Sequence, residues 1–299
     1  MVSTKKVDLF LDSGAYSAKT LKIVINIQDY IKFIKRHEKI IEVYANLDVI
    51  GDPKATLENQ KIMEGAGLHP LPVFHHPRSP SHWKYLDYYV GRYKYIALGG
   101  ITGERAFTYF NTVFRNYICD DKGMPKVKVH GFGLTSLRLM LEYPWYSLDS
   151  TSWVITGRLG SIYVPMFRDG KWIYNENSLK ITVSSRSPFA NVKDKHFNTL
   201  SPNVQKLILK YIEYKGYKLG ESIFKNVEQS YSPKDNERWA EKKPLDKKAK
   251  RSLEIVKEPG ISNTYQLRDE LNIIYFQDFE EASPPWPQPY QPRRVKGFF

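Results

Sequence analysis

Short apolar runs alternate with longer amphipathic segments over the first 160 residues of the chain. Each run is rich in β-branched and aromatic residues and ends in polar residues or glycine, which is typical of a buried strand. The six runs are 7–12, 41–48, 69–76, 93–100, 126–133 and 145–150. Between them the pattern predicts helices over about 28–39, 54–66, 81–91, 103–118 and 135–142.

The alternation of strand and helix predicts an α/β fold with a parallel sheet, either open or closed into a barrel. The runs follow one another at roughly 20 to 35 residues, the scale of a βα unit. Six runs are two short of an eight-stranded barrel. We expect segments 160–167 and 171–175 to add a hairpin or to complete the closure.

The character of the chain changes after about residue 176. Residues 200–227 predict one or two amphipathic helices. The Pro-rich segment 283–299 is expected to be extended and packed over a surface, or disordered. We therefore divide the chain into a core, 1–176, and a basic, mostly helical extension, 177–299, which we expect to pack on the core and to contact nucleic acid.

The charge balance favours a polyanionic partner. Among 299 residues, 45 are Lys or Arg and 32 are Asp or Glu, a net charge of +13. Cys119 is the single cysteine, which excludes an intrachain disulfide and a Cys-rich zinc site. The N-terminus lacks the apolar stretch of a signal peptide, and no run is long enough to span a membrane. We expect a cytoplasmic protein.

Acidic residues end three of the apolar runs: Asp12, Asp48 and Asp149. The carboxyl ends of parallel strands form one rim, so these side chains should converge. A single Asp after a strand is usually a turn or cap residue, and only the combination predicts a site. Paired carboxylates suit substitution at the anomeric carbon of a sugar, one as nucleophile and one as general acid/base. Three acids also suit Mg²⁺ and phosphoryl chemistry.

Four short segments occur in a characteristic order: LDSGAYS (11–17), LGGITGE (98–104), VHGFGLTS (129–136) and SLDS (147–150). They resemble, in order and approximate spacing, the DSGG[FY]Q, GG-L-A-V-GE, MGVGTP and D-M-F-D segments of tRNA-guanine transglycosylases. The second segment is one residue shorter than its counterpart. The resemblance covers about residues 7–160 and implies a TIM-like (β/α)8 barrel, modified or incomplete.

The resemblance implies a role for each matching residue. Asp149 matches the nucleophile, which attacks C1′ of the sugar and forms a covalent glycosyl-enzyme, and Asp12 matches the general acid/base. Asp48 matches an aspartate that reads the edge of a guanine-type base. Gly99 and Gly100 match the backbone part of the base pocket. A 7-deazaguanine would then replace the guanine in a second displacement.

The departures from the family decide which branch the chain resembles. PVFHHP (72–77) occupies the stretch where the family has a glutamine, so either His75 or His76 is expected to take its place. Tyr16 and Phe132 are expected to stack near the base. The cysteine cluster that binds zinc in the tRNA enzymes is absent, and the C-terminal half is unlike theirs. A shortened, zinc-free relative resembles the phage-type DNA-guanine transglycosylases, which insert a 7-deazaguanine into DNA and so hide it from restriction enzymes.

DNA is therefore the expected partner, with a free 7-deazaguanine of the preQ0 type as co-substrate and without a cofactor or metal. An oligomer is compatible with the sequence. We expect backbone contacts from Arg158, Lys242, Lys243, Lys247, Lys248, Arg293 and Arg294. Three alternatives stay open: the same exchange on tRNA, a nucleic-acid-binding barrel without activity, and a sugar hydrolase that uses Asp12 and Asp149.

Overall fold

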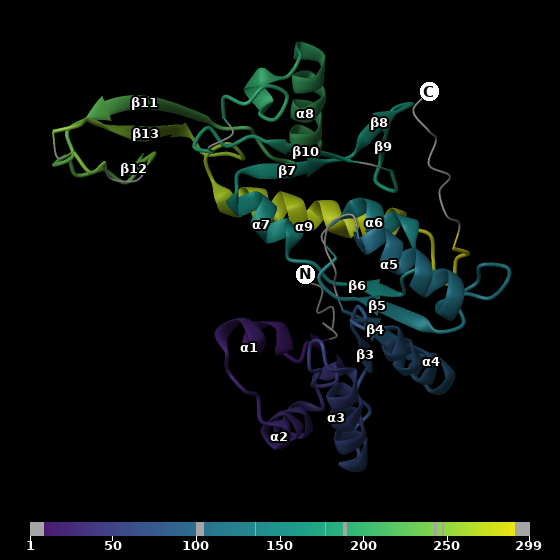
Figure 1. The fold of residues 1–299 in the computed structure, drawn as a ribbon. Helices are drawn as coiled ribbons and strands as arrows, with labels where there is room; N and C mark the ends of the chain where they lie inside the picture. Colours follow the sequence, from purple (N-terminus) through teal and green to yellow (C-terminus); the bar gives the residue numbers. More distant parts are fainter. Residues whose placement is uncertain are drawn as a thin grey trace. The chain divides into compact units, whose positions relative to one another are not determined.

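The structure is a computed structural model that describes residues 9–99, 105–134, 136–176, 178–187, 190–241, 244–246 and 248–290. The chain folds into two units (Figure 1). Unit 1 comprises the described residues of Met1–Ser150 and Pro284–Phe299, and unit 2 those of Thr151–Ser283. The division follows Ser150, whereas the sequence predicted it after residue 176. The reason is that the strand at 161–164 pairs with a later strand of unit 2, at 179–182.

Unit 1 is built on parallel strands in sequential order, which confirms the predicted α/β class. The strands are β1 (Leu9–Leu11), β2 (Ile41–Tyr44), β3 (Val73–Phe74), β4 (Tyr95–Leu98), β5 (Lys128–Gly131) and β6 (Ser147–Leu148). β1 pairs with β2, and β3 to β6 form a four-stranded sheet. A parallel bridge between Ala45 and Leu71 joins the two sets of strands. Each strand lies within one of the six predicted runs.

Side chains on the inner face show that this sheet is strongly curved. Phe10 of β1 and His130 of β5 stack with their ring centroids 4.4 Å apart. Neighbouring strands lie about 4.8 Å apart, so a flat sheet would separate β1 from β5 by about 19 Å. The sheet therefore curls until these two strands face each other across its concave side. Small residues, Ala45 and Ala97, are buried in the cluster beside these rings.

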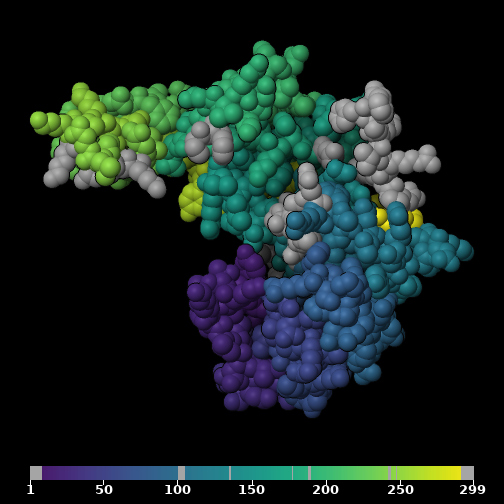
Figure 2. Space-filling view, viewed as in Figure 1, coloured from purple at the N-terminus to yellow at the C-terminus, as the bar shows by residue number. Residues whose placement is uncertain are grey.

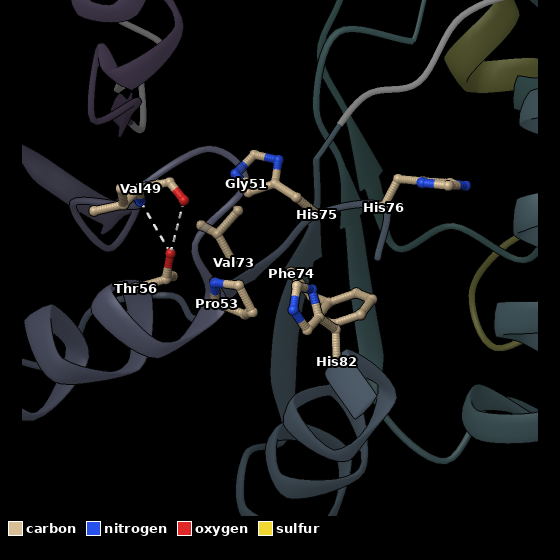
Figure 3. A pocket seen from close by; sticks show the side chains of 9 residues that line it. All are labelled: Val49, Gly51, Pro53, Thr56, Val73, Phe74, His75, His76 and His82. Carbon is tan, nitrogen blue, oxygen red and sulfur yellow. Dashed lines mark hydrogen bonds between the residues drawn. The ribbon is translucent and has the colours of Figure 1, made fainter. Parts of the chain in front are cut away.

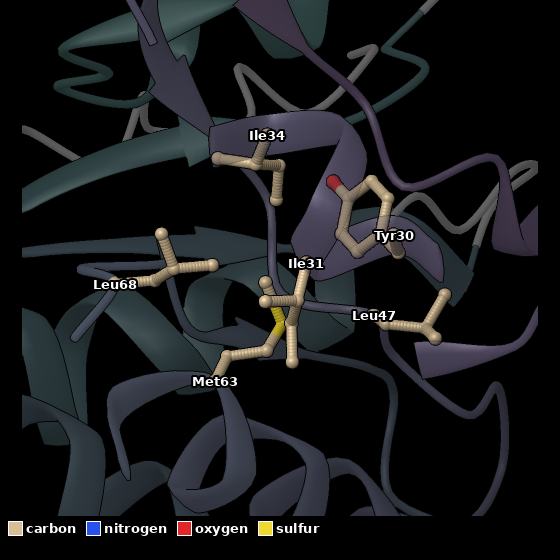
Figure 4. Close-up of a cluster of buried hydrophobic side chains, with 6 residues drawn as sticks. All are labelled: Tyr30, Ile31, Ile34, Leu47, Met63 and Leu68. Atoms are coloured by element: carbon tan, nitrogen blue, oxygen red, sulfur yellow. The ribbon is translucent and has the colours of Figure 1, made fainter. Parts of the chain in front are cut away.

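Helices cover the outer face of the sheet and follow the predicted alternation. They are α2 (Ile27–His37), α3 (Pro53–Gly65), η1 (Pro80–His82), α4 (Trp83–Arg92), α5 (Arg105–Val113), η2 (Phe114–Ile118) and α6 (Leu137–Glu142). Tyr30, Ile31 and Ile34 of α2 pack with Met63 of α3 in a buried cluster (Figure 4). The short helix α1 (Ala15–Leu21) was not predicted, because it buries no side chain and so lacks an apolar face.

Unit 2 departs further from the sequence-based expectation. Its elements are α7 (Ser152–Arg158), β7 (Ser161–Val164), β8 (Met166–Arg168), β9 (Lys171–Ile173), β10 (Leu179–Thr182), η3 (Phe197–Thr199), α8 (Pro202–Tyr214), β11 (Glu221–Val227), β12 (Glu237–Trp239), β13 (Arg251–Glu258) and α9 (Tyr265–Ala282). β8 and β9 form the predicted hairpin. β7 does not extend the parallel sheet; it pairs antiparallel with β10. Among the described residues no pairing joins β6 to β1, and the closed barrel that the sequence predicted is therefore not seen.

The extension is not mostly helical. Residues 221–227, expected as helix, form β11 in an antiparallel sheet with β13 and β12. This sheet projects from the rest of unit 2 (Figure 2). At 284–290 the Pro-rich segment is extended and packs within unit 1, as predicted: Tyr290 is buried and stacks on Tyr143 at 5.5 Å.

Candidate active site

Three carboxylates converge at the carboxyl ends of the unit 1 strands. Asp12 directly follows β1, Asp48 lies in the loop after β2, and Asp149 directly follows β6. Both Asp48 and Asp149 lie close enough to Asp12 to raise its pKa. Asp12 and Asp48 likewise raise the pKa of the buried Tyr30 hydroxyl, after burial itself. The curvature of the sheet therefore assembles a negative site in a chain with a positive net charge.

Asp12 has a pKa above its usual range. Partial burial is the largest cause, Asp48 is the next, and Asp149 adds a smaller contribution. Backbone N–H groups of Gly14 and Ser13 act in the opposite direction. Gly14 has a φ of 74° at the start of α1, a left-handed conformation that glycine adopts without strain. This turn reverses the chain right after Asp12. Asp12 stays open to solvent, so water screens part of its electrostatic interaction with Asp48 and Asp149.

Asp48 is the most enclosed of the three acids, with 7% of its side chain exposed. Ser13 Oγ donates to its Oδ1 at 2.8 Å, and His75 Nε2 lies 2.6 Å from its Oδ2. The loop that carries Asp48 is also held in place at Val49, whose N–H donates to Thr56 Oγ1 at 2.9 Å (Figure 3). Asp48 is therefore a buried, preorganised acceptor.

Gly99 leaves room for the ring of His75 because it has no side chain. A Cβ at Gly99 would lie 1.9 Å from Nδ1 of His75, well inside van der Waals contact. His75 also lines a small pocket with Val49, Gly51, Pro53, Thr56, Val73, Phe74, His76 and His82 (Figure 3). His76 points away from Gly51 in this view, and its ring lies 5.0 Å from that of Tyr109. His75 thus connects this pocket to Asp48.

Asp149, like Asp12, is an exposed acid of the site. Its side chain is 51% exposed, and its Oδ1 accepts a 2.6 Å hydrogen bond from the N–H of Gly133. Its backbone continues the β5–β6 ladder, since its N–H donates to the carbonyl of Gly131 at 3.2 Å. One carboxylate oxygen is thus held by the protein, while the side chain reaches solvent.

His130 was not selected as a site residue from the sequence, yet it lies against Asp149. Its Nε2 is 3.7 Å from Oδ1 of Asp149, and its Nδ1 is 2.7 Å from Oγ of Ser147. Phe132, predicted to stack near the base, contacts the His130 ring edge-on at 4.5 Å. The sequence signal available for His130 was its position two residues before Phe132 at the end of an apolar run. Ser13 and Ser147 lie within the segments LDSGAYS and SLDS, but the resemblance assigned neither of them a role.

Other predicted residues lie elsewhere. Tyr16 is on α1 with 75% of its surface exposed and makes no ring contact with another described residue, and its stacking on a base stays a prediction. Arg158, at the end of α7, and Lys248 are exposed residues of unit 2. The remaining predicted positions lie outside the described residues: Gly100, Lys242, Lys243, Lys247, Arg293 and Arg294.

No group of three or more His, Cys, Asp or Glu residues in the described part of the chain could hold a metal ion. None of its helices combines the length and the apolar character needed to cross a membrane. No family model, curated protein or solved structure matches this chain.

Proposed function

We propose that the protein is a base-exchange transglycosylase that replaces guanine in DNA with a 7-deazaguanine of the preQ0 type. The convergence of Asp12, Asp48 and Asp149 at the strand ends is the observation that carries this proposal. The oxocarbenium-like transition state of anomeric substitution is positive, so a cluster of carboxylates stabilises it. The curved sheet of unit 1 supports a TIM-like (β/α)8 barrel in an incomplete form.

The first displacement removes guanine. A carboxylate oxygen of Asp149 attacks C1′, the C1′–O bond forms, and the C1′–N9 bond breaks with its electron pair passing to guanine. Asp12 donates the proton that lets guanine leave as a neutral base. Its raised pKa supports this role, because a carboxyl group must hold its proton to act as an acid.

The second displacement installs the new base. The ionised Asp12 accepts the N9 proton of the 7-deazaguanine, and N9 attacks C1′ on the face opposite Asp149. The C1′–N9 bond forms as the bond to Asp149 breaks, which restores the free carboxylate. Two inversions give net retention at C1′. No cofactor is consumed, because the proton taken up by Asp12 replaces the one it gave.

Asp48 is suited to recognise both the outgoing and the incoming base. Guanine and 7-deazaguanine present N–H and NH2 donors along one edge, and a carboxylate is their natural acceptor. Ser13 and His75 each occupy one lone pair of Asp48, which leaves a second lone pair on each oxygen.

The net charge of +13 supports a nucleic acid as the larger substrate. In duplex DNA the target guanosine must leave the base stack to reach a site at the strand ends. A tRNA substrate would use the same chemistry on an exposed base. DNA is preferred because the chain lacks the zinc-binding cysteines that the tRNA enzymes carry.

Exchange of a labelled 7-deazaguanine into duplex DNA and into tRNA, run in parallel, tests the proposal. We expect label in DNA with the wild-type chain and none with Asp149→Ala. Label in tRNA alone would keep the chemistry and overturn the substrate. No label in either, with nucleic acid still bound, would favour a barrel that binds without reacting.

A further inference from the structure

His130 is a buried histidine with one ring nitrogen bonded and the other unpaired. Only 3% of its side chain is exposed. Nδ1 lies 2.7 Å from Oγ of Ser147, whereas Nε2 has no hydrogen-bond partner among the described residues. A buried polar group left without a partner costs about 1–3 kcal/mol. An unpaired nitrogen at this position therefore points to a partner that is engaged only during function.

Tyr95 determines which ring nitrogen of His130 carries the proton. The Tyr95 hydroxyl lies 2.6 Å from Oγ of Ser147, and no other described residue accepts its proton. When Tyr95 donates to Ser147, the Ser147 proton is left for Nδ1 of His130. The proton of the neutral imidazole then sits on Nε2, and we assign this tautomer.

The acceptor that faces this N–H is Asp149. Nε2 of His130 is 3.7 Å from Oδ1 of Asp149, less than 1 Å beyond the usual hydrogen-bond length of about 2.9 Å. Gly133 already donates to the same oxygen at 2.6 Å. Oδ2 accepts no hydrogen bond from any residue that the structure describes. Catalytic hydrogen bonds are often long before substrate binds, and a small rotation of the half-exposed carboxylate would close this gap.

The imidazole itself is held in place by aromatic rings. It stacks on Phe10 with an interplanar angle of 23° and meets Phe132 edge-on. Phe10 lies on β1 and Phe132 directly follows β5, the two strands that the curvature brings together. The ring cannot turn away from Asp149 without losing both contacts and the bond to Ser147. His130 is thus preorganised toward Asp149.

We propose that His130 is a positioning residue, which donates from Nε2 to Oδ1 of Asp149 when substrate fills the site. This inference rests on the proposed function, in which Asp149 is the nucleophile. With Oδ1 held by His130 and Gly133, the carboxylate keeps one orientation and Oδ2 is the oxygen that attacks C1′. Tyr95 and Ser147 act through His130, by fixing its tautomer.

Two substitutions at His130, one without a donor and one that keeps a donor, test this role. His130→Leu keeps an apolar side chain against Phe10 and removes the donor, whereas His130→Gln retains an N–H. We expect His130→Leu to lower kcat of base exchange by about 100-fold while KM changes by less than about 3-fold. The kcat of His130→Gln should be about 10-fold higher than that of His130→Leu.

A purely structural role predicts a different pattern. It would lower the amount of folded protein, and the folded fraction would react at the kcat of the wild type. A wild-type kcat in folded His130→Leu, or a His130→Gln variant as slow as His130→Leu, would overturn the inference.

Nitrogen NMR of the full chain separates this inference from the proposed function, because it needs no activity. The resonances of His130 should report a proton on Nε2, and the Nε2 signal should move in Asp149→Asn. A proton on Nδ1 would overturn the inference whatever the exchange assay gives. The expected tautomer, together with no exchange by the wild-type chain, would support the contact and overturn the proposed function.

Discussion

The imidazole of His75 is hydrogen-bonded to the carboxylate of Asp48, with Nε2 2.6 Å from Oδ2. Only 7% of the Asp48 side chain is exposed. A donor already fixes each oxygen of this carboxylate, since Ser13 holds the other one. An acceptor held in this way can discriminate between bases, because its geometry does not adjust to a wrong partner.

Removing the charge of Asp48 should impair recognition of the base. We expect Asp48→Asn to weaken binding of the free 7-deazaguanine by about 10- to 100-fold, the range for a lost hydrogen bond to a charged group. Isothermal titration calorimetry measures this directly. Asp52→Asn is the matched control, because Asp52 caps α3 through Ala55 and asparagine caps equally well. Equal affinity in Asp48→Asn and wild type would exclude Asp48 from recognition.

A methyl group at Gly99 should displace His75. The added Cβ would lie 1.9 Å from Nδ1 of His75, so the ring must leave Asp48. We expect Gly99→Ala to lower base exchange by at least about 10-fold while the chain remains folded. Gly91→Ala in α4 meets no atom within 4 Å and should stabilise the protein by about 0.5–1 kcal/mol without changing exchange. Comparable exchange rates in both variants would contradict the role assigned to Gly99.

The positions of the three acids could be predicted from the sequence because each ends an apolar run. In a parallel sheet, that pattern alone places Asp12, Asp48 and Asp149 on one edge. The contact between His130 and Asp149 could not be predicted in this way. It depends on how far the sheet curls, and curvature arises from packing between strands that are distant in sequence.

The extension shows a second limit of the sequence pattern. Residues 221–227 continue the apolar spacing of α8, but they follow Gly216 and Gly220, which both have positive φ values. These glycines end the helix and lead into β11, whose pairing with β13 spans more than twenty residues. Long-range pairing of this kind leaves little trace in local periodicity.

The raised pKa of Asp12 makes stability depend on pH. Above the folded-state pKa the carboxylate is charged in both states, and the folded state is destabilised by its surroundings. As pH falls through that raised pKa toward the ordinary value of 3.8, the folded protein takes up the proton first and this penalty disappears.

Asp12→Asn should therefore be more stable than wild type at about pH 7, by less than about 1 kcal/mol because water screens an open carboxylate. The difference in free energy of unfolding should shrink at about pH 4. Urea unfolding of both proteins at the two pH values measures it. A difference that grows on acidification would contradict the raised pKa.

The packing between α2 and α3 should carry much of the stability of unit 1. Met63 is fully buried, whereas its neighbour Ile62 is 43% exposed. Met63→Ala should lower the free energy of unfolding by about 2–5 kcal/mol, and Ile62→Ala by about 0.5 kcal/mol or less. Urea unfolding of the two variants compares one buried and one exposed site on the same helix. Equal losses would contradict the buried cluster of Figure 4.

Trapping the covalent intermediate tests whether Asp149 is the nucleophile. End-labelled duplex DNA is incubated with the protein without any incoming base, denatured, and separated from free DNA on a denaturing gel. The account predicts a protein–DNA adduct that forms with the wild-type chain, is absent with Asp149→Asn, and disappears when 7-deazaguanine is added. Base exchange without such an adduct, or an adduct that persists in Asp149→Asn, would contradict the role of Asp149 as nucleophile.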